Sequence, residues 1–277
     1  MLVAGFLFGC MGVFVKLGAA FFTNTELVFY RSFIGLIIMY AIVRQRGGSI
    51  ITTQLKGHLW RGISGTIALL LFFYCITVLP LATAVTLNYT SPLFLAMLLV
   101  LVLKERVHAP LILAIILGFA GMVLLLHPTL ERNQLTTGLL GIISGFFAGI
   151  AMLKVRELAQ RGEPEWRTVF YFSLIASLAS GSLMLFDDMH AVSIQCGLLL
   201  LGMGTSATLA QLALTRAYST GKTLTASSLS YSAVVFATLF GIAFWDEKLA
   251  LSSWIGMALI ITSGIASLKL SLSEKAI

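Results

Sequence analysis

Two cationic side chains lie inside apolar stretches of this sequence, where a charge is costly. Lys16 lies in the run 2–21 and Arg31 in the run 27–43, and no acidic residue lies inside any of the long apolar runs. A charge at the centre of a membrane helix costs about 2.5 to 3.5 kcal/mol on insertion scales. Either these side chains extend to the surface, with Arg31 bonded to carbonyls or to Glu26, or they line a cavity that attracts a carboxylate or phosphate and repels cations.

A second group of polar residues occurs in a stretch that is present twice, at 82–106 and 224–248. A shift of 142 positions aligns Thr83 with Thr225, Tyr89 with Tyr231, Phe94 with Phe236 and Glu105 with Glu247. Each copy has a polar first half, an apolar second half and a charged end. Internal repeats of this kind divide a chain into related halves.

Amide and phenol groups in the repeated stretch predict a polar cavity. Asn88, Tyr89 and Ser91 lie six to nine residues into the first copy, which is about 9 to 14 Å at helical rise. Pro92 follows and removes a helix hydrogen bond. Ser and Thr often bond to their own helix or join helices, but an unpaired amide in hydrocarbon costs several kcal/mol. The predicted binding residues are Lys16, Arg31, Tyr74, Asn88, Tyr89, Ser91, Gln211, Ser230 and Tyr231, with Pro92 as the helix break.

The two acidic residues that end the copies, Glu105 and Glu247, stand beside Arg106 and Lys248. We interpret them as salt-bridged helix ends at the membrane surface. A role in proton coupling is less favoured, because both lie at the interface and not at mid-depth.

The composition predicts an all-α integral membrane protein. Charged residues are 10% of the chain and hydrophobic residues 58%, whereas soluble chains carry about 25% charged residues. The apolar runs are close to the roughly 20 residues that span a bilayer, and they lack the alternation of a β-barrel. The ten predicted spans are 2–21, 27–43, 62–79, 82–103, 109–127, 138–155, 168–186, 195–215, 223–245 and 251–270.

The basic residues predict the orientation of these spans. Fourteen of the eighteen Lys and Arg residues lie in the links and tail on one side, and only Arg132 and Lys248 lie in links on the other. The basic side is normally cytoplasmic, which places both termini there. Five spans in each half (1–135 and 136–277) make the second half an inverted copy of the first. Gly5 and Gly9 then match Gly141 and Gly145.

Several functional classes are not expected. The net charge of +7 lies at span ends, so a nucleic-acid partner is not predicted. Cys10, Cys75 and Cys196 are too far apart in the sequence for a disulfide or metal pattern. We predict no metal and no cofactor, and there is no Walker A pattern for ATP. Without an acidic or histidine cluster inside the spans, no catalytic residues and no enzyme activity are expected.

The order of these features resembles the EamA-type drug/metabolite transporter family over essentially the whole chain. The features are the segment Val28–Ser32 around Arg31, the paired glutamates, and the glycines Gly118, Gly121, Gly256 and Gly264. The resemblance implies a bacterial inner-membrane carrier with a central cavity, which exports amino acids or related metabolites. One departure is Phe172, which replaces an arginine in the second half.

Inverted repeats are typical of secondary transporters, whose halves alternate around a site at mid-depth. The predicted function is therefore alternating-access transport of a small molecule by a monomer or homodimer in the lipid bilayer. Two other readings stay open. One is a carrier of S-adenosylmethionine-like, nucleoside-like or drug molecules, and the other is a membrane partner protein that transports nothing.

Overall fold

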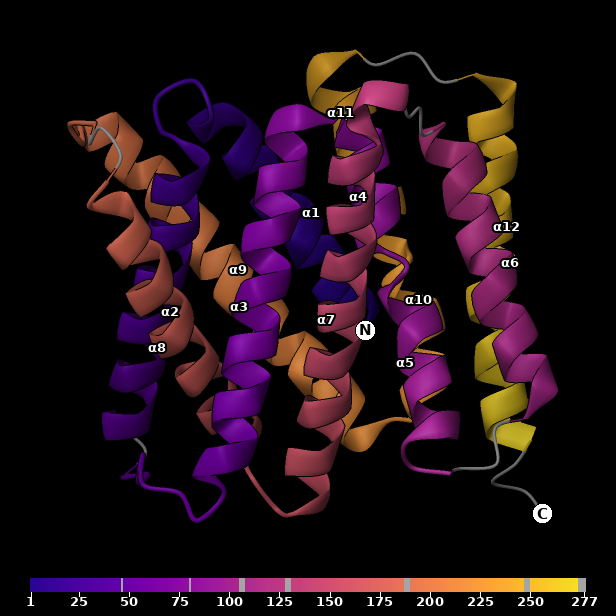
Figure 1. Ribbon diagram of the computed structural model, residues 1–277, viewed down its shortest axis with the longest axis horizontal. Coiled ribbons are helices and arrows are strands. Elements are labelled where there is room, and N and C mark those ends of the chain that lie inside the picture. The colour runs from indigo at the N-terminus through magenta and orange to yellow at the C-terminus, as the bar shows by residue number, and fades with distance from the viewer. Residues whose placement is uncertain are drawn as a thin grey trace.

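The computed structural model describes residues 1–45, 47–79, 81–104, 108–127, 131–186, 190–246 and 250–273. Over these ranges the chain forms twelve α-helices and one short 3-10 helix, and no β-strand (Figure 1). The helices are α1 (Leu2–Gly18), α2 (Asn24–Gln45), α3 (Leu55–Val78), α4 (Leu81–Asn88), α5 (Ser91–Leu101), α6 (Ala109–Leu126), α7 (Leu135–Gln160), α8 (Glu165–Met184), α9 (Ile194–Thr220), α10 (Thr223–Ser230), α11 (Ser232–Trp245) and α12 (Leu251–Ser273), with η1 (Arg132–Gln134) before α7. The predicted all-helical fold is confirmed.

Eight segments of the described chain are long and apolar enough to cross a membrane, and α1 is a shorter apolar helix. Three of the eight combine consecutive helical elements: α4 with α5, η1 with α7, and α10 with α11. Helix α8 is not among them, although it has 20 residues. The predicted count of ten spans therefore stays a prediction.

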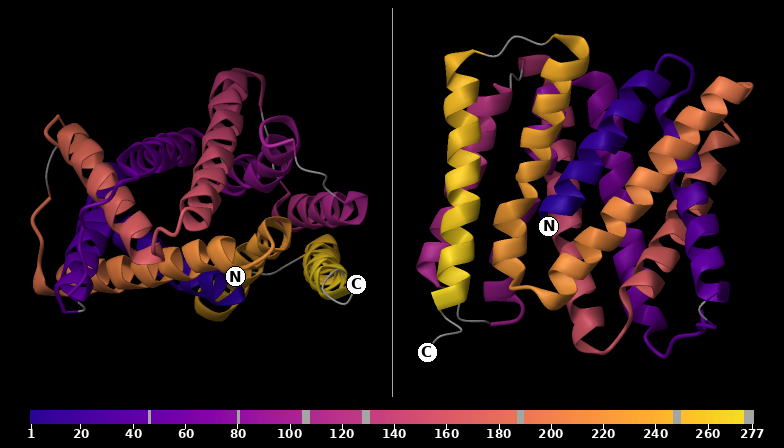
Figure 2. Two further views of the ribbon diagram at one scale, coloured as in Figure 1. Left: turned by 90° about the horizontal axis from the view of Figure 1, so that it is seen from below. Right: turned by 180° about the vertical axis from the view of Figure 1, so that it is seen from behind.

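The main helix contacts join the two halves of the chain. Helix α1 packs against α9, α2 against α8, α3 against α7, and α6 against α12. Each pair takes one helix from before residue 135 and one from after it. The pair α6 and α12 stands side by side at one edge of the molecule (Figure 2). The halves thus pack against each other and are not two separate bundles.

Helix α3 begins earlier than the sequence indicated. We predicted a span from residue 62 and a basic link before it, but the helix starts at Leu55 and includes His58 and Arg61. These two residues are one turn apart, so they lie on the same face of the helix. Both are buried. The prediction was wrong here because hydropathy separates polar from apolar residues only. It therefore assigned the buried polar side chains of His58 and Arg61 to a link outside the helix.

Both copies of the repeated stretch contain a helix break at the same place. Helix α4 ends at Asn88, and α5 begins at Ser91 with Pro92 in its first turn, where a missing N–H leaves no bond unmade. Helix α10 ends at Ser230 and α11 begins at Ser232. The second break has no proline.

Hydroxyl groups stabilise the two breaks in the same way. The Thr90 hydroxyl donates to the carbonyl oxygen of Leu87, and the Ser232 hydroxyl donates to that of Leu229, both at 2.6 Å. Carbonyls at a helix end lack a partner within the helix, and these side chains supply one. A local hydrogen bond therefore maintains each break.

Candidate functional site

A small cavity lies between α2, α8 and α9, with Arg31 in its wall. The lining residues are Arg31, Ser32, Val169, Phe172, Ser173, Ala207, Thr208 and Gln211. The cavity volume is about 10 Å³, counted as the space open to the centre of a water-sized sphere. That is room for about one water molecule. The structure thus brings two predicted binding residues, Arg31 and Gln211, to one cavity. We call it the arginine cavity.

A second arginine, absent from the predicted site, reaches this region from α3. Arg61 is 2% exposed, and its guanidinium lies 4.4 Å from the ring centre of Phe172, which lines the cavity. A Cβ at Gly65 would collide with Nη1 of Arg61. The side chain therefore extends along α3 away from the nearer end of that helix. Phe172 is the residue that the sequence match pairs with Arg31. Its ring packs against the guanidinium of Arg61, which comes from another helix.

Both arginines lie more than one turn inside their helices. Gly65, beside the Arg61 guanidinium, is ten residues from the start of α3, which is about 15 Å at helical rise. Arg31 is seven residues from the start of α2, about 10 Å along the helix. Arg61 is buried, and Arg31 is partly exposed in the wall of the arginine cavity.

Neither arginine has a carboxylate partner among the described residues. Glu26, the carboxylate considered for Arg31, instead accepts hydrogen bonds from the backbone N–H groups of Thr23 (2.8 Å) and His190 (2.7 Å). Nε and Nη1 of Arg61 have no hydrogen-bond partner in the described chain. Arg31 lies close enough to repel Arg61 electrostatically. The site therefore holds uncompensated positive charge.

A polar stripe on α9 runs from the arginine cavity to a group of tyrosines. Its residues, Thr208, Gln211, Thr215 and Tyr218, follow at intervals of three and four, so they share one helix face. All four are buried. Nε2 of Gln211 and Oγ1 of Thr215 lack a hydrogen-bond partner in the described part of the chain. Their free polar atoms are suited to a ligand or water.

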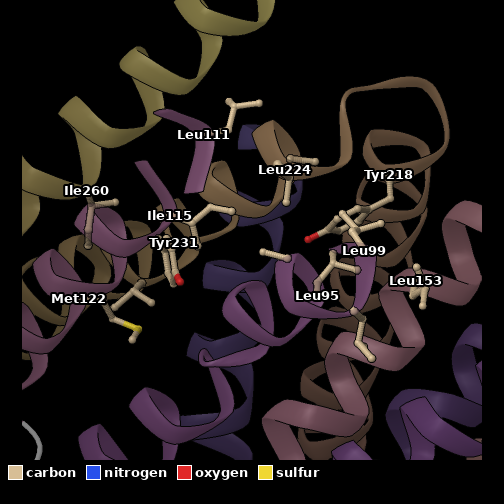
Figure 3. Packing of buried hydrophobic residues seen from close by; sticks show 14 of the residues in the cluster. Leu95, Leu99, Leu111, Ile115, Met122, Leu153, Tyr218, Leu224, Tyr231 and Ile260 are labelled. Atoms are coloured by element: carbon tan, nitrogen blue, oxygen red, sulfur yellow. The ribbon is translucent and has the colours of Figure 1, made fainter. Parts of the chain in front are cut away.

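The tyrosine group contains Tyr89, Tyr218 and Tyr231. The ring centres of Tyr89 and Tyr231 are 6.2 Å apart, and the Tyr218 hydroxyl lies 3.3 Å from that of Ser227. Tyr231 is fully buried beside Gly118, and its hydroxyl has no partner within the described ranges. Figure 3 shows Tyr231 near Ile115 and Met122, and Tyr218 beside Leu99. The two matched tyrosines thus meet in the apolar core.

Other predicted binding residues form bonds within the protein. Nδ2 of Asn88 donates to the hydroxyl of Ser144 at 2.7 Å, and that hydroxyl donates to the carbonyl of Ala68 at 2.8 Å. This chain joins α4, α7 and α3. The Ser230 hydroxyl donates to its own helix at Ser227. Ser91 is partly exposed at the start of α5.

The remaining predicted residues lie away from the arginine cavity. Lys16 is in the last turn of α1, with Nζ 4.1 Å from the ring centre of Trp245. Tyr74, on α3, is 50% exposed. Glu105 and Glu247 lie outside the described residues. The predicted set therefore divides between the cavity, the tyrosine group and the helix ends.

A group of polar side chains around one carboxylate joins the halves at one end of the bundle, and we did not predict it. Glu163, between α7 and α8, lies 3.1 Å from Nε2 of His58 and accepts hydrogen bonds from Thr52 (2.6 Å) and Arg167 (2.7 Å). Burial raises the pKa of Glu163, but the hydrogen bonds from Thr52, Arg167 and His58 outweigh it, so the pKa lies below its ordinary value. The ring of Tyr171 stacks on that of His58.

A similar contact occurs where α2 begins, one helix length away. Oε2 of Glu26 lies 2.9 Å from Nδ1 of His190. We call the two contacts, Glu163–His58 and Glu26–His190, the end contacts. Each joins a residue before position 135 to one after it. No sequence signal marks these residues, because Glu and His are common at span ends.

The chain resembles known membrane carriers over almost its whole length. The model of the EamA-like transporter family matches residues 1–127 and 135–268. The chain is 30% identical to the pseudopaline exporter CntI of Pseudomonas aeruginosa, over 95% of this chain and 93% of that protein. It is 31% identical to an uncharacterized transporter of Helicobacter pylori (96% and 92% covered), and 26% identical to a riboflavin transporter of Vibrio cholerae (95% and 89% covered).

The fold also matches a solved crystal structure. The TM-score is 0.85 at 19% sequence identity, with 98% of this chain and 96% of the other covered. At this identity the match concerns the fold alone.

Proposed function

The chain belongs to the EamA-like transporter family, and from this premise we propose that it is a secondary carrier that exports a small metabolite by alternating access. The arginine cavity is the observation that supports the proposal most directly. It lies between α2 of the first half and α8 and α9 of the second. Carriers built from inverted repeats bind their substrates near mid-depth, where the repeats meet.

Matched helix contacts support an inverted repeat of residues 1–135 and 136–277. A Cβ on Gly5 would lie 2.7 Å from Oγ of Ser232, and a Cβ on Gly145 would collide with Oγ1 of Thr90. One turn further along, a Cβ on Gly9 would lie 3.2 Å from the Cβ of Phe236, and a Cβ on Gly149 would lie 3.1 Å from the Cβ of Phe94. Thus α1 contacts the second break as α7 contacts the first. These contacts equate Gly5 with Gly145 and Gly9 with Gly149, one helix turn beyond our sequence match.

The size of the cavity supports a mechanism with conformational change. Room for about one water molecule does not accommodate a metabolite, so helices around Arg31 must separate to admit one. The end contacts oppose this separation, because each joins the halves at one end. Breaking one while keeping the other opens the site to one side, as alternating access requires.

The direction and orientation in the proposal rest on two observations. The basic residues are concentrated on one side, which favours an inner-membrane protein with cytoplasmic termini. The relative named as a pseudopaline exporter is similar over nearly its full length. We therefore favour export.

A second candidate substrate is a ring-bearing compound. The tyrosine group offers aromatic faces and a free hydroxyl on Tyr231, and aromatic pairs stabilise stacked ligands. The chain is 26% identical to a riboflavin transporter. This reading predicts that the tyrosines, more than the arginines, determine the substrate.

Efflux from proteoliposomes tests the carrier function. Vesicles are loaded with labelled amino acids, acidic metabolites and flavins, and efflux is followed for the wild type and for Arg31→Gln. The control Arg44→Gln removes an exposed charge from the same helix. We expect selective efflux that Arg31→Gln abolishes and Arg44→Gln retains. Absence of flux for every compound, or full flux with Arg31→Gln, would refute the proposal.

A further inference from the structure

We propose that an organic anion with two carboxylate groups binds where the helices around the arginine cavity separate. One carboxylate is held by Arg31 in the cavity wall and the other by Arg61, which lies against the lining residue Phe172. This inference rests on the proposed carrier function, because it assigns the class of the transported substrate. It also assigns a binding role to Arg61, a residue that the sequence pattern placed in a link.

The charge of the site carries the argument. The Arg61 guanidinium is buried and partly exposed Arg31 lines the cavity close enough to repel it, and the described residues provide no carboxylate for either. Arginine stays protonated in proteins, so the charge cannot be removed by loss of a proton. One bound negative charge would leave a buried cation uncompensated. A ligand with two negative charges neutralises the site.

The position of Arg61 fits binding better than a structural role. The aromatic face of Phe172 supports the guanidinium at 4.4 Å and leaves its edge free, and Nε and Nη1 lack partners in the described chain. A guanidinium edge binds a carboxylate through two parallel hydrogen bonds. Arg61 is thus oriented by Phe172 with an unused binding edge.

Gln211 supplies a further donor in the cavity wall. Its Nε2 is buried without a partner among the described residues, whereas the neighbouring Thr208 hydroxyl already donates to the carbonyl of Gly204 at 2.6 Å. An amide N–H donates to a carboxylate as a charge-assisted hydrogen bond. Gln211 therefore adds selectivity for an acceptor group.

Two carboxylates fit the arrangement better than one phosphate. The two arginines arise from different helices, which start at opposite ends of the bundle (Figure 1). Each planar group matches one carboxylate. A single compact phosphate would have to meet both. The same chemistry on a phosphate ester remains an outcome of the test.

Thermal unfolding of the purified protein in detergent measures binding directly. The probes are the dicarboxylates glutarate and succinate, with butyrate as the monocarboxylate control and inorganic phosphate as the compact dianion. Variants are Arg31→Gln and Arg61→Gln, each with a matched removal of an exposed charge from the same helix, Arg44→Gln and Lys56→Gln. A ligand that binds the folded state raises the unfolding temperature according to its affinity.

We expect glutarate or succinate to stabilise the wild type more than butyrate or phosphate. Each arginine variant should weaken this binding by about ten- to hundredfold, the loss of one charged hydrogen-bonding group. The variants of Arg44 and Lys56 should bind as the wild type does. Arg61→Lys, which keeps the charge but loses the planar edge, should give an intermediate affinity and covers the case in which Arg61→Gln fails to fold.

Equal binding by wild type and arginine variants, or no binding of any dicarboxylate, would overturn the inference. Tighter binding of phosphate than of glutarate would reassign the site to phosphate esters. Efflux measured in parallel separates the two proposals. Dicarboxylate binding without flux contradicts the carrier function, while arginine-independent flux of neutral metabolites contradicts only the dicarboxylate site.

Discussion

Nε2 of His58 lies 3.1 Å from Oε2 of Glu163, and this contact connects α3 of the first half to the segment before α8 of the second. The side chain of His58 is fully buried and that of Glu163 is 6% exposed. Arg167 binds the same carboxylate from one turn further along the chain. The contact is therefore part of a network, which stabilises the folded state more than an isolated surface ion pair does.

The first prediction concerns pH. Folding lowers the pKa of Glu163 below its ordinary value of about 4.5. Such a carboxylate stabilises the folded state above the unfolded-state pKa, and the contribution is lost as the pH falls through the folded-state pKa. The difference in unfolding temperature between wild type and Glu163→Gln should thus shrink as the pH falls below about 4.5. Thermal scans between pH 3 and 6 measure it.

Glu165→Gln is the control for this prediction, since Glu165 is the neighbouring carboxylate and accepts a hydrogen bond from Ser219. A difference for Glu163→Gln that grows on acidification would contradict the assigned network.

The second prediction separates stability from transport at Arg61. A buried cation without a carboxylate partner destabilises the fold, and replacing buried ion pairs by apolar residues often stabilises proteins by about 1 to 4 kcal/mol. Arg61→Met should therefore raise the unfolding temperature and reduce transport strongly. Lys56→Met, at an exposed position of α3, should leave transport unchanged. A lowered unfolding temperature for Arg61→Met would indicate a structural partner for the guanidinium.

The third prediction assigns Asn88 a structural effect. Its amide donates to Ser144, which in turn donates to the backbone of α3. Asn88→Ala and Ser144→Ala should each lower stability by about 0.5 to 2 kcal/mol, the usual range for hydrogen bonds between membrane helices. The double variant should cost less than the sum of the two, because both remove the same bond. Unfolding and the KM for transport are measured together, and an altered KM with unchanged stability would instead place Asn88 in the binding site.

The fourth prediction concerns the close contact of α6 and α12. A Cβ on Gly256 would lie 2.5 Å from the carbonyl oxygen of Gly121 and 2.6 Å from the backbone nitrogen of Leu125. Backbone atoms cannot rotate away, so Gly256→Ala should destabilise by about 1 to 3 kcal/mol, as overpacking does. Gly12→Ala is the control, because nothing lies within 4 Å of its Cβ position. Equal unfolding temperatures for the two variants would argue against this packing.

Much of the helical layout could be predicted from the sequence, because long apolar runs have few alternatives to a membrane helix. The internal match also aligned Tyr89 with Tyr231, and in the structure the centres of their rings lie 6.2 Å apart. Arg31 stood out for a similar reason, as a charge within an apolar run. It shares its cavity with Gln211.

Arg61 could not be identified from the sequence, because its environment is made by another helix. The segment 55–61 is polar enough to read as a link, and only the contact with Phe172 of α8 explains a buried arginine there. The end contacts were missed for the same reason. Residues such as Glu26 and His190 are far apart in the sequence and become partners only through the packing of α2 and α8.

The two end contacts also have a thermodynamic consequence. An alternating-access carrier opens to one side when the end contact on that side breaks. The form in which the weaker contact is broken is the more populated one, and the ratio of the two forms follows the difference in free energy between the two contacts. Each 1.4 kcal/mol of that difference changes the ratio about tenfold. His190 is 49% exposed and His58 is fully buried, so the two contacts are unequal. Under the proposed alternating-access function, the preferred facing of the empty protein should therefore change with substitutions at either end that leave the arginine cavity untouched.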